Sequence, residues 1–161
     1  SRDFAHRSAV ETRMAELFPS QKGARHARRH VKVSMKPRRR GVSIWFQPAS
    51  ASVLPPALGV AGVVEPWNYR LSLSFGSLPA ALAAGNRVMV KMSEYTPATG
   101  ELLQKLARQY FGDELLMVVN GGAELAQAFT RLPFDHLLFT GSTAVGRHVM
   151  HAAAENLTPV T

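Results

Sequence analysis

The sequence contains no cysteine. This absence excludes disulfides, thiolate metal sites and a cysteine nucleophile within the 161 residues. Long apolar runs are also missing: none approaches the roughly 18 residues that a membrane span requires, and no apolar signal core follows the basic residues at the start. With 46% hydrophobic and 19% charged residues, the composition is typical of a soluble globular domain. We therefore expect a cytoplasmic protein with no membrane partner.

Acidic residues are absent from one long stretch, since no Asp or Glu occurs between Glu16 and Glu65. Nine of the 19 Lys and Arg residues lie between Lys22 and Arg40, so the net charge of +8 comes from this basic segment. Several of them recur at helical spacing on one face. A solvated or subunit-facing helix is favoured over a nucleic-acid site, because no aromatic residues are interleaved to stack bases. We expect no specific nucleic-acid partner.

The first part of the chain predicts two helices and a hairpin. Helical periodicity covers residues 4–18 and 21–35, with a break at the segment PSQKG. The apolar runs 42–46 and 51–54 predict the two strands of a β-hairpin, which two prolines end.

From residue 58 onward, short apolar runs alternate with helical segments. Strands that are apolar on both faces and joined by helices indicate a parallel sheet covered on both sides. Right-handed crossovers make such a sheet doubly wound. The predicted fold class is therefore α/β, a Rossmann-like doubly wound parallel sheet with N-terminal helices and a β-hairpin arm. The predicted strands are residues 58–65, 86–91, 115–120 and 135–140, and the predicted helices are residues 71–84, 98–111, 122–130 and 142–153.

Polar or glycine-bearing turns follow all four predicted strands. They are PWNY at 66–69, KMSE at 91–94, NGG at 120–122 and TGST at 140–143. Because ligands of open parallel sheets bind outside the carboxyl ends of the strands, the four turns predict a binding site at that edge.

Several residues of these turns also have a purely structural interpretation. Ser142 and the helix start behind it could face an anion or form an ordinary strand-to-helix turn. Trp67 could be a ligand platform or a core or interface aromatic residue, and Asn68 could be a ligand or the N-cap of the next helix. Lys91 and Glu94 could hold ribose hydroxyls or form a surface ion pair. These alternatives stay open at this point.

The six histidines do not predict a metal site. His26 and His30 lie one helical turn apart, as do His148 and His151, but neither pair belongs to an H-E-x-x-H pattern. The G-x-S-x-G motif of a serine hydrolase is also missing.

Four ordered segments together resemble the aldehyde dehydrogenase superfamily: PWNY at 66–69, AALAAGNRVMVKMSE at 80–94, FDHLLFTGSTAVGR at 134–147 and AAAENLTPVT at 152–161. The NGG, FDH and LTPVT elements are similar to the class 3 branch and, within it, to coniferyl aldehyde dehydrogenase-like proteins. This resemblance covers nearly the whole chain. It implies oxidation of an aldehyde substrate to a carboxylic acid, with NAD, or alternatively NADP, as the cofactor, in a homodimer of the complete enzyme.

The resemblance also implies a role for each matching residue. Asn68 matches the side-chain amide of the oxyanion hole, while Lys91 and Glu94 match the pair that holds the adenine ribose. Gly121 and Gly122 match the turn beside the adenine. The other implied cofactor-binding residues are Val64, Pro66 and Trp67 in the cleft, and Gly141, Ser142 and Val145 at the helix that receives the pyrophosphate.

The domain organisation implied by the resemblance is incomplete. Residues 1–41 match helices of the cofactor-binding domain, residues 42–57 a hairpin and linker of the oligomerisation type, and residues 58–161 part of an NAD-binding domain. The family's nucleophilic cysteine, general-base glutamate and catalytic domain have no match, so we expect a truncated fragment that is inactive alone. Arg70 and Met92 stand where the family usually has proline. A stand-alone nucleotide-binding or regulatory pseudoenzyme module is the alternative.

Overall fold

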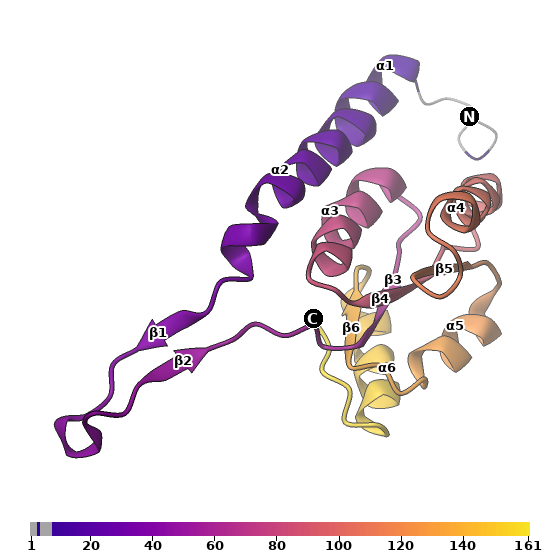
Figure 1. The fold of residues 1–161 in the computed structure, drawn as a ribbon. Coiled ribbons are helices and arrows are strands. Elements are labelled where there is room, and N and C mark those ends of the chain that lie inside the picture. Colours follow the sequence, from indigo (N-terminus) through magenta and orange to yellow (C-terminus); the bar gives the residue numbers. More distant parts are fainter. Residues whose placement is uncertain (1–2, 4–7) are drawn as a thin grey trace.

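The computed structural model describes residue 3 and residues 8–161, except for the side chain of Arg70. Its body is a four-stranded parallel sheet between two layers of helices, and a long N-terminal helix leads into a hairpin that projects away from this body (Figure 1). The predicted α/β class, with a Rossmann-like parallel sheet, N-terminal helices and a hairpin arm, is confirmed.

The four predicted strand–helix units are all present, each with ends within a few residues of the prediction. The strands pair in the order β5-β4-β3-β6, and every pair is parallel. The strands are β3 (Val60–Val64), β4 (Arg87–Lys91), β5 (Leu116–Val119) and β6 (His136–Phe139). The helices that follow them are α3 (Arg70–Ala83), α4 (Pro97–Tyr110), α5 (Ala123–Thr130) and α6 (Thr143–Ala154).

The core lies on both faces of the sheet, as strands without a polar face require. On one face Val63 and Val90 pack with Leu78 of α3 and Leu103 of α4. On the other face Leu137 packs with residues of α5 and α6, among them Phe129, Val149 and Ala153. Helices α3 and α4 therefore cover one face, and helices α5 and α6 cover the other (Figure 1).

The last residues of the chain run parallel to β6. The Leu137 N–H donates to the Pro159 carbonyl at 2.9 Å, and the Thr161 N–H donates to the Leu137 carbonyl at 3.0 Å. The edge of β6 that faces away from β3 is thus hydrogen-bonded to residues 159–161.

The predicted break in the N-terminal helix is wrong. The chain stays helical through α1 (Ala9–Thr12), a π-helical turn (Arg13–Leu17) and α2 (Phe18–Ser34), while residues 4–7 of the prediction lie outside the described residues. Pro19 directly follows the π-helical turn and lies in the first turn of α2, where a missing backbone N–H is tolerated. Gly23 faces α3, where a Cβ would make an ordinary van der Waals contact with the Phe75 carbonyl oxygen at 3.4 Å.

The predicted hairpin is present, but the predicted position of its first strand is wrong. Strand β1 (Arg38–Arg40) pairs antiparallel with β2 (Ala51–Val53), whereas residues 44–46 form a 3₁₀ turn at the tip. The apolar run that predicted a strand is exposed instead of buried, and Trp45 at its centre is 89% exposed. Arginines form the first strand because both strands of this arm lie in solvent, where burial does not select apolar residues.

Among the described residues, no helix combines the length and the apolar character needed to cross a membrane. The same residues contain no group of three or more His, Cys, Asp or Glu side chains arranged to hold a metal ion.

Candidate functional site at the carboxyl edge of the sheet

The strand order creates a switch point beside β3. From β3 the chain proceeds to β4 and β5 on one side and then crosses to β6 on the other side. The register places Val64 next to both Lys91 and Phe139, so these strands end at the same level. The four turns therefore follow one edge of the sheet. With strands about 4.8 Å apart, the turns span roughly 14 Å from β5 to β6, which suits an elongated ligand.

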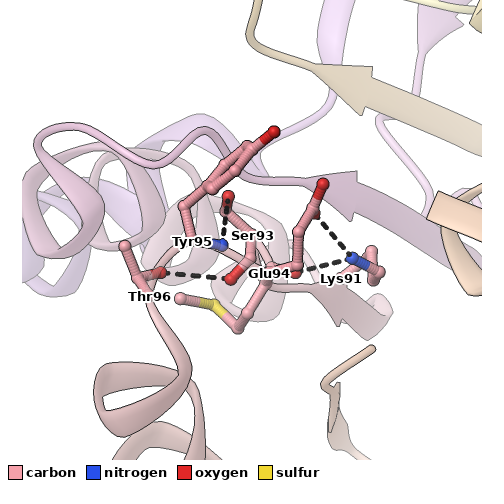
Figure 2. Close-up of polar contacts among 6 residues, drawn as sticks. Lys91, Ser93, Glu94, Tyr95 and Thr96 are labelled. Atoms are coloured by element: carbon pink, nitrogen blue, oxygen red, sulfur yellow. Dashed lines mark hydrogen bonds and ion pairs between the residues drawn. The ribbon is translucent and has the colours of Figure 1, made fainter. Parts of the chain in front are cut away.

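A buried lysine and a half-exposed carboxylate form the polar centre of this edge (Figure 2). The Lys91 side chain is only 2% exposed, and its ammonium group donates to the Met92 carbonyl at 2.8 Å. The same Nζ lies 3.8 Å from Oε2 of Glu94, which is 41% exposed. Burial lowers the pKa of Lys91, and the negative charge of Glu94 opposes that shift. The structural alternative of a surface ion pair does not fit a lysine that is buried.

The turn after β4 holds Glu94 in place (Figure 2). The Ser93 carbonyl accepts hydrogen bonds from both the N–H and the hydroxyl of Thr96, each at 3.2 Å, and the Tyr95 N–H approaches the Ser93 hydroxyl at 3.4 Å. Thr96 is fully buried. A short turn closed by these bonds restricts where the Glu94 carboxylate can point.

Met92 has a structural reason to stand where a proline was expected. Its side chain is fully buried in the core under α3 and α4. Its N–H donates to the Val119 carbonyl of β5 at 3.1 Å, a bond that proline cannot make. The side chain of Arg70, the other departure, lies outside the described residues.

The turn after β3 exposes Trp67 and Asn68. Trp67 is 53% exposed, which excludes the core aromatic alternative in this structure. The N-cap of α3 is Tyr69, in the left-handed region at φ 48°, so Asn68 is not the N-cap. The start of α3 is capped from a distance, because the Leu71 N–H donates to Oε2 of Glu16 at 2.8 Å. The Asn68 side chain is exposed at the edge beside partly buried Pro66.

The turns after β5 and β6 both lead into helices. Gly122 is the N-cap of α5, and a Cβ on it would meet open space, whereas a Cβ on Gly121 would lie 2.5 Å from the Leu125 side chain. Ser142 is the N-cap of α6, and its hydroxyl accepts from the Val145 N–H at 3.4 Å.

The glycine at the β6 turn has a packing reason that the sequence alone did not reveal. A Cβ on Gly141 would lie 2.5 Å from the Phe139 ring. The structural interpretation of the turn therefore applies: Gly141 makes room for the ring and Ser142 caps α6. The interpretation as an anion site stays a prediction.

One residue of this region was missed by the sequence reasoning. Glu65 directly follows β3 and is only 5% exposed, with no hydrogen-bond partner for its Oε2 among the described residues. Burial raises its pKa to about 7, against a smaller opposing effect of a hydrogen bond with Ser74. The available signal was an acid that ends an otherwise apolar run, LGVAGVVE.

The described residues also form a groove away from this edge, between α2 and α3. Small and apolar side chains line much of it, including Gly23, Ala27, Pro79 and Ala83. We call it the α2–α3 groove. Its lining includes basic and histidine side chains but no carboxylate, so its chemistry differs from that of the sheet edge.

The strand order and the helices on both faces define a Rossmann-like α/β layer with its candidate site at the switch point. The family model described as the aldehyde dehydrogenase family matches residues 14–161, and the chain belongs to this family.

The relatives agree with the class 3, coniferyl aldehyde dehydrogenase-like resemblance. The chain is 60% identical over 99% of its length to a probable coniferyl aldehyde dehydrogenase of Pseudomonas aeruginosa, of which it covers 34%. It is 45% identical over its whole length to a coniferyl aldehyde dehydrogenase of a Pseudomonas species, of which it covers 33%. It thus spans about a third of the length of these curated relatives.

Solved structures show the same arrangement of elements. The structure described as the substrate-bound state of Staphylococcus aureus AldH has a TM-score of 0.91 and 34% identity, covering 94% of this chain and 33% of that one. PnpE in complex with nicotinamide adenine dinucleotide has a TM-score of 0.80 and 26% identity, covering 93% of this chain and 31% of that one.

Proposed function

We propose that the protein is an NAD(P)-dependent aldehyde dehydrogenase that oxidises an aldehyde of the coniferyl type to a carboxylic acid. The Lys91–Glu94 pair carries this proposal, because it presents a carboxylate, supported by a buried ammonium, at the switch-point edge. The names of the Pseudomonas relatives support the aldehyde class. The dinucleotide in the PnpE complex supports the cofactor.

The residues at the edge match the chemistry of a dinucleotide. The Glu94 carboxylate would accept hydrogen bonds from the adenine ribose hydroxyls, and Lys91 would hold that carboxylate in place. Gly121 and Gly122 would lie beside the adenine. The start of α6, with Gly141, Ser142 and Val145, would face the pyrophosphate, where backbone N–H groups and the helix dipole favour negative charge. Val64, Pro66 and Trp67 would line the rest of the cleft.

Asn68 would supply half of an oxyanion hole. Its exposed side-chain amide is a hydrogen-bond donor for an oxygen that gains negative charge in the reaction. Bound NAD would supply the hydride acceptor. The chain contains no cysteine, so we propose that the nucleophile and the general base come from outside these 161 residues, and that the 161 residues alone do not oxidise aldehydes.

The missing cysteine also favours a second candidate, a nucleotide-binding or regulatory module without catalysis. Both candidates predict dinucleotide binding, but only the first predicts that a complete protein containing this chain forms NADH in the presence of an aldehyde. Absorbance at 340 nm with coniferaldehyde therefore separates them.

The projecting hairpin arm supports a homodimer of the complete enzyme as the assembly, because Trp45 at its tip is an exposed aromatic residue without a buried role in the chain. We propose oligomerisation as the role of this arm.

The experiment that tests the dinucleotide site is a calorimetric titration of the protein with NAD. We expect Glu94→Ala to weaken binding by about 1–3 kcal/mol, since ribose hydroxyls would lose their acceptor. Glu101→Ala, at an exposed glutamate on α4, is the matched control and should leave the affinity unchanged. Equal affinities for the Glu94→Ala variant and the unsubstituted protein would remove Glu94 from the site.

A further inference from the structure

Glu65 occupies an unusual place for a carboxyl group. It follows the last residue of β3, and the alternation of side chains along the strand puts it on the same face as Val63, towards the core under α3 and α4. It is 5% exposed, and Oε2 has no hydrogen-bond partner among the described residues. A buried polar atom without a partner costs free energy, which makes Glu65 a candidate for a functional role.

The backbone and side chain of Glu65 tie the β3 turn to two neighbouring elements. Its N–H donates to the Lys91 carbonyl of β4 at 3.0 Å. Its carboxyl group shares a hydrogen bond with Ser74, a fully buried residue of α3. The turn closes at Tyr69, whose carbonyl accepts from the Leu73 N–H at 2.9 Å. Pro66, Trp67 and Asn68 thus lie between two anchored ends.

The protonation state of Glu65 decides how firmly it stays in this buried position, because burial penalises the charged form more than the hydrogen bond with Ser74 favours it. A neutral carboxyl can be both donor and acceptor, whereas a buried carboxylate needs a positive partner. On β4, Lys91 directs its ammonium to Met92 and Glu94. On the N-terminal helix, Glu16 binds the Leu71 N–H, and on α3 the titratable residue is Arg70, whose side chain lies outside the described residues.

Burial without a compensating charge has the expected consequence. The pKa of Glu65 is raised to about 7, with burial as the larger cause and the hydrogen bond with Ser74 opposing it. The carboxyl group therefore changes charge near neutral pH.

We propose that Glu65 is a positioning residue: in its neutral form it holds the Pro66–Asn68 turn in the arrangement that binds the dinucleotide, and loss of its proton to solvent loosens that turn. The identity of the ligand rests on the proposed function, whereas the movement of the turn does not. Glu65 acts through Trp67 and Asn68 and does not itself touch the ligand.

The two tryptophans of the chain provide a direct test. Trp67 reports on the turn, and Trp45 at the hairpin tip is the internal control. In a proton–nitrogen NMR titration from about pH 5.5 to 8.5, we expect the Trp67 indole signal to shift with a midpoint near pH 7 while Trp45 stays constant. In Glu65→Gln, which keeps the neutral shape, the Trp67 signal should no longer move. An identical titration of Trp67 in both proteins would overturn the proposal and assign the shift to a histidine.

A second experiment measures the affinity for NAD at different pH values. We expect the affinity of the unsubstituted protein to fall about tenfold from pH 6 to pH 8.5, and that of Glu65→Gln to vary much less. Parallel affinity profiles for the two proteins would contradict the positioning role. If neither protein binds NAD at any pH, the proposed function fails, and the Trp67 titration still decides whether Glu65 controls the turn.

Discussion

Glu16 on the N-terminal helix caps the first turn of α3, because its Oε2 accepts the Leu71 N–H at 2.8 Å across 55 positions of sequence. The same region is joined a second time by the Ser20 hydroxyl, which donates to the Leu71 carbonyl at 3.1 Å. The N-terminal helix therefore fixes the end of the turn that carries Asn68.

We expect Glu16→Ala to lower the free energy of unfolding by about 1–3 kcal/mol, since the partly buried Leu71 N–H would lose its acceptor. Glu16→Gln keeps a carbonyl acceptor and should cost less. Urea denaturation measures both, with exposed Glu101→Ala as the control. Equal stability of Glu16→Ala and the control would show that the cap contributes nothing.

A second long-range cap involves Asp3, whose carboxylate accepts the N–H groups of Ala98 and Thr99 at 3.1 and 2.9 Å at the start of α4. Replacing an acidic cap typically costs about 1 kcal/mol. We expect Asp3→Ala to lower the free energy of unfolding, measured by urea denaturation, by about 1 kcal/mol. The stability of Asp3→Asn should lie between that of Asp3→Ala and that of the unsubstituted protein. Removal of Asp3 without any loss of stability would argue against the cap in solution.

Burial of Glu65 predicts a pH dependence of stability. Its pKa is about 7 in the folded protein against the ordinary value of 4.5, so the folded state holds the proton more tightly than the unfolded state. The stability that this proton provides is complete below about pH 4.5, declines as the pH rises and is lost above about pH 7.

By this linkage the loss amounts to about 3 kcal/mol. Glu65→Gln should remove this component, so its stability relative to the unsubstituted protein should rise between pH 5 and pH 8. Denaturation at the two pH values makes the comparison, and an unchanged difference would mean that Glu65 is solvated.

The same edge predicts which dinucleotide is preferred. A 2′-phosphate on NADP would meet the negative charge of Glu94, although the ammonium of Lys91 lies 3.8 Å from that carboxylate and offsets part of the repulsion. We expect NAD to bind more tightly than NADP. The Glu94→Gln substitution should reduce the difference between the two affinities. Competition calorimetry measures the ratio of the two dissociation constants. Tighter binding of NADP than of NAD would contradict this prediction.

The sequence predicted the sheet better than the arm for a physical reason. Strand β3 is apolar throughout because it is covered on both faces, so its sequence pattern predicts a strand. Pro19 and Gly23 were interpreted as a helix break, but Pro19 falls in the first turn of α2, and α2 continues past Gly23 along α3. In the hairpin, burial does not select residue type, and the apolar run 42–46 therefore predicted a strand at the exposed tip.

At the candidate site, the positions of the turns could be predicted but not the environment of their side chains. The sequence places Lys91 and Glu94 three residues apart, yet only the fold shows that Lys91 is buried and Glu94 half exposed. Glu65 was missed because a carboxyl group at the end of a strand is ordinarily exposed, and its burial depends on packing by α3. The functional assignments of the site residues stay predictions.

Amide chemical-shift mapping during a titration with NAD would show whether a dinucleotide binds along the carboxyl edge of the sheet. We expect this binding to produce its largest shifts in the turns at residues 66–69, 91–94, 120–122 and 141–145. Shifts confined to the α2–α3 groove, or no shifts at saturating NAD, would contradict it.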